Sequence, residues 1–103
     1  RLVEVPLVRD ADGPYQLDLA GLERAFAAGA RAFLLCSPHN PVGRVWTRAE
    51  LEAVAALADR YGVLVLVDEI HGPLVYQPHR HVPFATLDAP AAREAICAVF
   101  AVG

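Results

Sequence analysis

Two short stretches of the chain carry polar side chains of the kinds that bind ligands or take part in catalysis. DEIH, at residues 68–71, follows the apolar run of residues 63–67, and SPHNPVG occupies residues 37–43. Carboxylates hold metal ions or stabilise cationic groups, and an amide or imidazole can orient a ligand by hydrogen bonding. A strand that is apolar along its length and charged at its tip is therefore the first candidate for a site.

The residue types in these stretches raise the question of two kinds of metal site. DEIH fits the metal-binding strand of a P-loop ATPase, in which an aspartate holds Mg²⁺, but the phosphate-cradling pattern G-x-x-x-x-G-K-[ST] does not occur in the sequence. This class remains a distant alternative. His71, His79 and His81 match no standard ligand spacing and have no cysteine nearby, so no metal site is expected.

The elements that must position the two stretches alternate between strand and helix. Thr47 and Glu50 have the spacing of a capping box, Asp18 is a suitable N-cap, and Gly62 is placed to end a helix. Trp46 is expected to cover the junction between the SPHNPVG loop and the helix that follows. Hydrophobic spacing predicts strands over residues 2–8, 31–37, 63–68 and 96–102, and helices over 19–28, 47–61 and 90–95.

This alternation predicts an α/β fold, a three-layer sandwich with a mostly parallel sheet. The run of residues 63–67 is apolar on both faces, which is typical of a central strand covered by helices on each side. Ligands of such sheets bind beyond the carboxyl ends of the strands, and both polar stretches lie at carboxyl ends.

Length and composition limit the class of protein. The chain has 103 residues, is 55% hydrophobic, and carries a formal net charge of −3, which predicts one small globular domain and argues against a nucleic-acid partner. No apolar run reaches the roughly 18–20 residues that span a bilayer, so no membrane partner is expected. No signal peptide is visible, and Cys36 and Cys97 lie in apolar runs as reduced cysteines would, so a cytoplasmic location is expected.

The order of motifs between residues 34 and 76 resembles a known family. An apolar strand, S-P-x-N-P-x-G, a capped helix, a second apolar strand and D-E-I-H follow one another as in fold-type I pyridoxal-phosphate (PLP) enzymes of the aminotransferase class I/II superfamily. The chain is most similar to cystathionine β-lyase-like C–S lyases of the MalY/PatB kind, whose H-x-P-F segment resembles residues 78–88. The resemblance implies PLP as cofactor, an amino acid as substrate, and a homodimeric enzyme.

The resemblance also implies roles for three residues. Asp68 would stabilise the protonated pyridine nitrogen of the cofactor, as a carboxylate in a water-poor site does. Asn40 would bind the cofactor's phenolic oxygen, and His71 stands where aminotransferases often have a tyrosine beside that oxygen. From the residues alone, Asp68 could instead cap the turn after its strand, and Asn40 could belong to an ordinary Pro-bounded turn. Glu69 is expected to point to the other side of the strand, in a structural or solvated role.

The resemblance finally implies that residues 1–103 are a central fragment of the PLP-binding large domain. All nine cationic residues are arginine, so the Schiff-base lysine, which follows the next strand in this family, is expected beyond residue 103. The phosphate-binding turn and the small domain are also expected outside the chain, which leaves no catalytic residue within it and predicts an inactive fragment. The parent enzyme is expected to cleave cystathionine or cysteine S-conjugates by α,β-elimination to a thiol, pyruvate and ammonia. An aminotransferase is the main alternative, and a non-catalytic α/β binding module is another.

Overall fold

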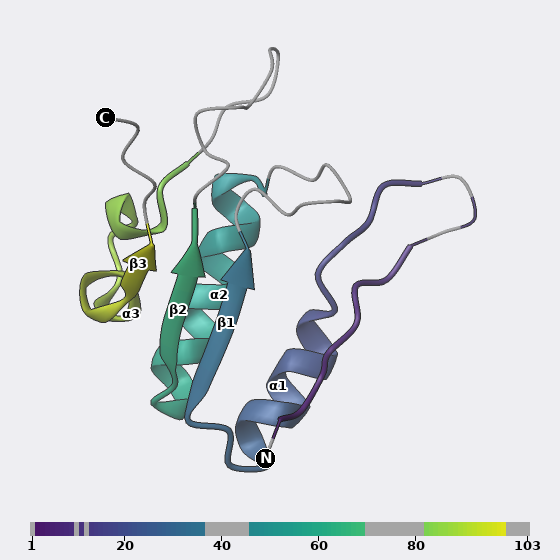
Figure 1. The fold of residues 1–103 in the computed structure, drawn as a ribbon, viewed down its shortest axis with the longest axis horizontal. Coiled ribbons are helices and arrows are strands. Elements are labelled where there is room, and N and C mark those ends of the chain that lie inside the picture. Colours follow the sequence, from purple (N-terminus) through teal and green to yellow (C-terminus); the bar gives the residue numbers. More distant parts are fainter. Residues whose placement is uncertain (1, 10, 12, 37–45, 70–81, 99–103) are drawn as a thin grey trace.

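The computed structural model describes residues 2–9, 11, 13–36, 46–69 and 82–98, and every structural statement below concerns these residues. Helices and strands alternate along the chain (Figure 1). Their order is α1 (Leu19–Ala27), β1 (Ala32–Cys36), α2 (Arg48–Tyr61), β2 (Leu64–Asp68), the 3-10 turn η2 (Phe84–Thr86), α3 (Pro90–Glu94) and β3 (Ile96–Ala98).

The three strands form a parallel sheet in the order β1-β2-β3. At the carboxyl end of β2, Asp68 is in register with Cys36 on one side and with Ala98 on the other. The predicted α/β class and parallel sheet are therefore confirmed, and β2 is the central strand of the sheet. Right-handed crossovers place the connecting helices of such units on a face of the sheet.

The two faces of the sheet differ in what covers them. Val65 and Val67 of β2 and Leu35 of β1 are buried in one core with the inner side of α2, which passes behind both strands in Figure 1. Burying a valine or leucine side chain fully contributes about 1.5–3 kcal/mol. On the opposite face Leu34 is 66% exposed and Leu64 is 38% exposed. In the described part of the chain, α1 and α3 both contact α2, so the sheet and one helical layer of the expected three layers are present.

Local capping residues set the ends of the helices, as predicted. The Asp18 carboxylate accepts a 3.0 Å hydrogen bond from the Gly21 N–H at the start of α1. Thr47 and Glu50 form both hydrogen bonds of the capping box, at 3.1 and 2.9 Å. Gly62 ends α2 with φ +66°, a left-handed conformation that glycine adopts without steric cost.

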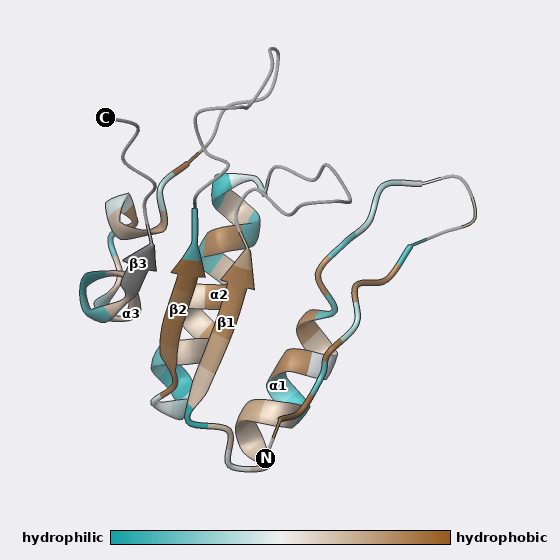
Figure 2. Ribbon diagram, in the orientation of Figure 1, coloured by the Kyte–Doolittle hydropathy of each residue, from teal (hydrophilic) through white to brown (hydrophobic). Residues whose placement is uncertain are grey.

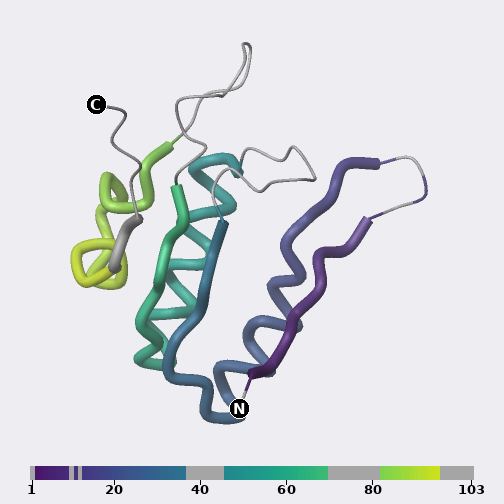
Figure 3. Tube along the Cα trace, in the orientation of Figure 1, coloured from purple at the N-terminus to yellow at the C-terminus, as the bar shows by residue number. Residues whose placement is uncertain are grey.

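The prediction of a strand over residues 2–8 is wrong. The described residues of this segment are extended, and their one ladder contact is an isolated antiparallel bridge between Val8 and Gln16. Figure 3 shows the segment running beside α1, away from the three-stranded sheet. Leu2 is 84% exposed, and Pro6 has no N–H to donate to a ladder. Among the described residues, no strand of the sheet pairs with this segment, so its alternating pattern does not form a strand.

Hydropathy along the ribbon follows the same organisation. In Figure 2, β1 and β2 are brown along most of their length, and β2 turns teal at its carboxyl end, where Asp68 lies. The polar tip of β2 is therefore the feature that distinguishes the carboxyl edge of the sheet from its apolar interior.

No helix in the described ranges is both long enough and apolar enough to cross a bilayer.

The backbone of Gly62 gives a first testable prediction. A Cβ added at Gly62 would meet no atom within 4 Å, so any cost of substitution comes from the left-handed backbone alone. We expect Gly62→Ala to lower the free energy of unfolding by about 1 kcal/mol. Gly62→Asn is the matched comparison, because asparagine tolerates this conformation, and it should cost clearly less in a denaturant titration. Equal losses in the two variants would contradict this account of how α2 ends.

Candidate functional site

The carboxyl ends of β1 and β2 lie side by side and bring Asp68 next to Cys36. The two residues are register partners in a parallel pair, so their side chains leave the sheet on the same face, opposite to the face that α2 covers. Both side chains are half-buried. A carboxylate on a rigid strand, partly shielded from water, is well suited to stabilise a positive charge on a bound ligand.

The Cys36 thiol responds to this environment. Burial and, to a smaller degree, the charge of the neighbouring Asp68 carboxylate raise the pKa of Cys36 above its ordinary value. Both effects act in the same direction, because each disfavours the thiolate. Cys36 therefore stays a neutral, weakly polar neighbour of Asp68 at pH 7.

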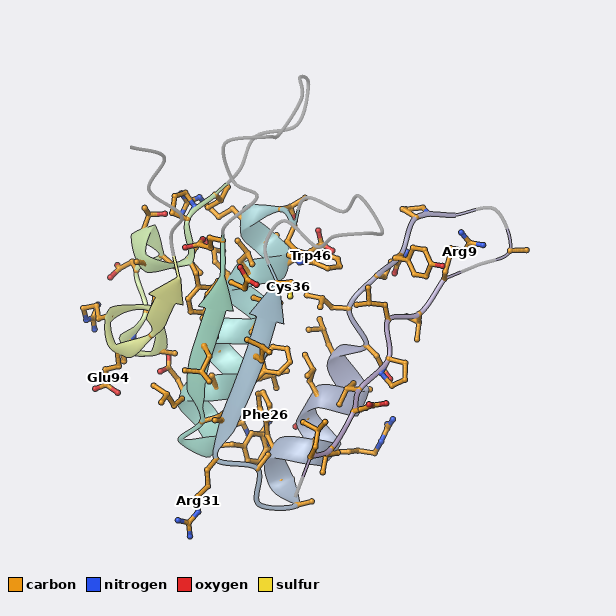
Figure 4. The ribbon with its side chains drawn as sticks, in the orientation of Figure 1. Arg9, Phe26, Arg31, Cys36, Trp46 and Glu94 are labelled. Atoms are coloured by element: carbon orange, nitrogen blue, oxygen red, sulfur yellow. The ribbon has the colours of Figure 1, made fainter. Side chains whose placement is uncertain are left out.

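Trp46 fixes the junction between the end of β1 and the start of α2. Its side chain is fully buried, and its indole N–H donates a 2.7 Å hydrogen bond to the Cys36 carbonyl oxygen. Figure 4 shows Cys36 and Trp46 together at the carboxyl end of β1. The bond joins the two described residues that flank residues 37–45, so Trp46 is packed at the start of α2 as predicted, whereas the loop side of the predicted junction lies outside the described residues.

Glu69 is the next residue after β2 and faces the core. It is 5% exposed, and its Oε2 atom accepts a 2.9 Å hydrogen bond from the backbone N–H of Phe84. Asp68 and Glu69 thus point to opposite sides of the sheet, as their alternation predicted. The structural role expected for Glu69 is confirmed, and the solvated role is excluded by its burial.

The structure places one of the three predicted site residues. Asp68 is at the carboxyl edge of the sheet, whereas Asn40 and His71 lie outside the described residues, as do His79 and His81. Asn40 follows four residues after Cys36 in the sequence, and Cys36 is the register partner of Asp68. The convergence of Asn40 and Asp68 on one cleft stays a prediction, and the strand ends that precede both segments do lie at the same edge.

Sequence reasoning missed two contacts near Asp68. The proximity of Cys36 depends on strand register, and a register cannot be read from either strand alone. The bond from Phe84 to Glu69 joins residues 15 positions apart. The sequence signal for this second contact was the segment at residues 78–88, which contains Phe84. A segment that packs against the sheet after DEIH can bring backbone N–H groups to the acidic residues at the end of β2.

Comparison with known proteins agrees with this arrangement. The family model for aminotransferase class I and II matches residues 2–100. A Mycobacterium leprae protein named provisionally as a cystathionine beta-lyase is 48% identical over 92% of this chain and 24% of its own length. The cystathionine beta-lyase PatB of Bacillus subtilis is 42% identical over 76% of this chain and 20% of its own length.

A solved structure supports the fold directly. Cystalysin from Treponema denticola, whose structure contains a pyridoxal 5′-phosphate cofactor, superposes with a TM-score of 0.87 at 34% identity, over 94% of this chain and 25% of that one. The chain belongs to the aminotransferase class I and II family, within which it is similar to the cystathionine beta-lyases. It spans between a fifth and a quarter of the length of these relatives.

The pair of Cys36 and Asp68 gives a second prediction. Asp68→Asn removes the carboxylate charge that disfavours the thiolate, so it should lower the pKa of Cys36 while burial still keeps that pKa above its ordinary value. The measurement is the pH dependence of alkylation by iodoacetamide, with mass spectrometry separating the Cys36 peptide from the Cys97 peptide.

Asp59→Asn is the matched control, because Asp59 is an exposed residue of α2, whereas the pKa of Cys36 is raised by burial and by Asp68. It should leave the alkylation profile unchanged. If Asp68→Asn also leaves the profile unchanged, the two side chains are not neighbours in solution.

Proposed function

We propose that the chain is a central part of the large domain of a PLP-dependent carbon–sulfur β-lyase. The whole enzyme would convert cystathionine or a cysteine S-conjugate, with one molecule of water, to a thiol, pyruvate and ammonia. The observation that carries the proposal is Asp68 at the carboxyl end of a central parallel strand, in a chain 48% identical to a relative named as a cystathionine beta-lyase. The PLP in the similar cystalysin structure supports the choice of cofactor.

The described residues fit one part of such a cofactor. Asp68 is half-buried at the sheet edge, beside a thiol that is neutral at pH 7, so its carboxylate has a partly water-poor site in which to stabilise a pyridinium nitrogen. PLP, when bound, supplies an electron sink for the electrons released at the substrate's α-carbon. We assign Asn40 and His71 to the cofactor's phenolic oxygen on the basis of their sequence motifs.

Asp68 performs an electrostatic task in this proposal. With PLP bound, its negative charge would favour the proton on the pyridine nitrogen, and Asp68 would thereby help to stabilise a negative charge developing on the substrate. The pairing of β2 on both sides holds the carboxylate in place, so little reorganisation is needed when charge develops. The elimination itself removes one proton from the α-carbon and releases the thiol from the β-carbon.

The proposal also covers the location, oligomeric state and partners of the whole enzyme. We infer a cytoplasmic homodimer that acts on a small amino-acid substrate and uses neither nucleic acid nor membrane as a partner. The family membership supports the amino-acid substrate.

An aminotransferase is the second candidate, because the matching family model bears that name. The two reactions differ in their products. With L-cystathionine as substrate, a lyase forms pyruvate and free thiol in equal amounts without an amino acceptor. An aminotransferase needs a 2-oxo acid and releases neither product. Measuring pyruvate and thiol with and without 2-oxoglutarate decides between them.

Replacing Asp68 tests its electrostatic role in the whole enzyme. Asp68→Ala should lower kcat/KM for β-elimination by about a thousandfold, which corresponds to about 4 kcal/mol of transition-state stabilisation. Asp59→Ala, on the exposed side of α2, is the control and should leave kcat/KM within about twofold of the original. Near-normal elimination kinetics in Asp68→Ala would remove Asp68 from the mechanism.

The absence of lysine from these 103 residues gives a further prediction. A Schiff base with PLP needs a primary amine, so in the whole enzyme the lysine must lie outside residues 1–103. Reduction of the enzyme with borohydride followed by peptide mapping should place the phosphopyridoxyl group on a lysine C-terminal to Gly103. A label on any peptide within residues 1–103 would show that the chemistry has been misplaced.

A further inference from the structure

Glu69 is unusual because, among the described residues, it is the one charged residue that is buried. Its position is one residue beyond the strand, since the ladder of β2 ends at Asp68. A carboxylate is expensive to bury unless polar groups bind it. The Phe84 N–H supplies such a group at 2.9 Å.

The segment that holds Glu69 is itself firmly seated. Phe84 is fully buried and Leu87 is 3% exposed, so the turn is anchored in the core from both ends. The Thr86 N–H and side-chain hydroxyl both donate to the Pro83 carbonyl, at 3.0 and 2.7 Å. The partner of Glu69 is therefore a short, internally bonded turn packed into the core.

Glu69 and Asp68 are adjacent but act on opposite sides of the sheet. In extended backbone, fixing one residue on the buried side restricts the direction in which its neighbour leaves the other side. The backbone pairs of Asp68 with Cys36 and Ala98 are the last on β2, so the bond from Phe84 is the next described constraint beyond them.

We propose that Glu69 is a positioning residue for Asp68: by accepting the hydrogen bond from Phe84, it fixes the carboxyl end of β2 and with it the Asp68 carboxylate. The proposal rests on the function proposed above for its catalytic consequence. Its structural part, the placement of Asp68 beside Cys36, does not depend on that function. The effect on Asp68 can therefore be measured with and without the cofactor.

The first experiment uses the cofactor-free protein and the alkylation profile of Cys36. Glu69→Leu introduces an apolar side chain of similar size and removes the acceptor, so the Asp68 carboxylate should lose its fixed place and the pKa of Cys36 should fall toward its ordinary value. Glu69→Gln keeps an acceptor oxygen and should restore the profile of the unmodified protein. In an Asp68→Asn background, Glu69→Leu should cause no further change, because the charge it repositions is already gone.

The second experiment uses the whole enzyme with L-cystathionine and the same double-mutant cycle, with Asp68→Ala as background. Glu69→Leu should lower kcat about tenfold with KM within about twofold, and Glu69→Gln should recover most of that loss. In the Asp68→Ala background, Glu69→Leu should change kcat less than twofold. If Glu69→Leu does not fold, Glu69→Asp takes its place, since a side chain shorter by one methylene keeps the charge and weakens the bond.

The outcomes separate the two proposals. If the unmodified enzyme forms no pyruvate and thiol, the proposed function fails, and the Cys36 profiles still decide on Glu69. If Glu69 variants have equal effects with and without the Asp68 carboxylate, in either experiment, Glu69 acts by another route and the inference is overturned. The same holds if Glu69→Gln is as impaired as Glu69→Leu, because the hydrogen bond would then not be what matters.

Discussion

The parallel pairing of β1 with β2 is the constraint on which the rest of this structure depends. It sets Cys36 opposite Asp68 and, at the same time, decides which side chains of both strands face α2. A slip of one residue would exchange the two faces and turn Val65 and Val67 out of the core. It would also drive Asp68 into the apolar interior. The burial of Val65 and Val67, at 0% and 2% exposure, is therefore what keeps the Asp68 carboxylate at the open side of the sheet edge.

Two neighbouring acids at the end of β2 receive opposite environments from this arrangement. Asp68 is half-buried beside a thiol, on the face that the described helices leave open, whereas Glu69 is enclosed and bound by a backbone amide. The same residue class thus serves two purposes within two positions of the chain. One carboxylate lies at the sheet edge beside Cys36, and the other accepts a hydrogen bond from the backbone of Phe84.

Local signals were sufficient to predict the helices and much of the sheet. The capping box at Thr47 and the helix end at Gly62 each depend on residues within four positions of each other, so both could be predicted from the sequence. The structure confirms both. The segment over residues 2–8 shows the limit of such signals, because an alternating pattern becomes a strand only where a partner strand exists. Asp68 was predictable from its place after an apolar run. Its neighbour Cys36 and the bond from Phe84 to Glu69 were not, since they depend on how separate elements dock.

Trp46 gives the region an optical property. It is the single tryptophan of these 103 residues, and it is fully buried with its indole N–H bound to a carbonyl oxygen at the end of β1. An indole shielded from water in this way emits at shorter wavelength than one in solvent. A chromophore that binds at the carboxyl edge of this sheet and absorbs in the near ultraviolet, where this indole emits, is positioned to accept excitation energy from it. The side chain that joins the end of β1 to the start of α2 is thus also an intrinsic fluorophore, hydrogen-bonded to Cys36, the register partner of Asp68.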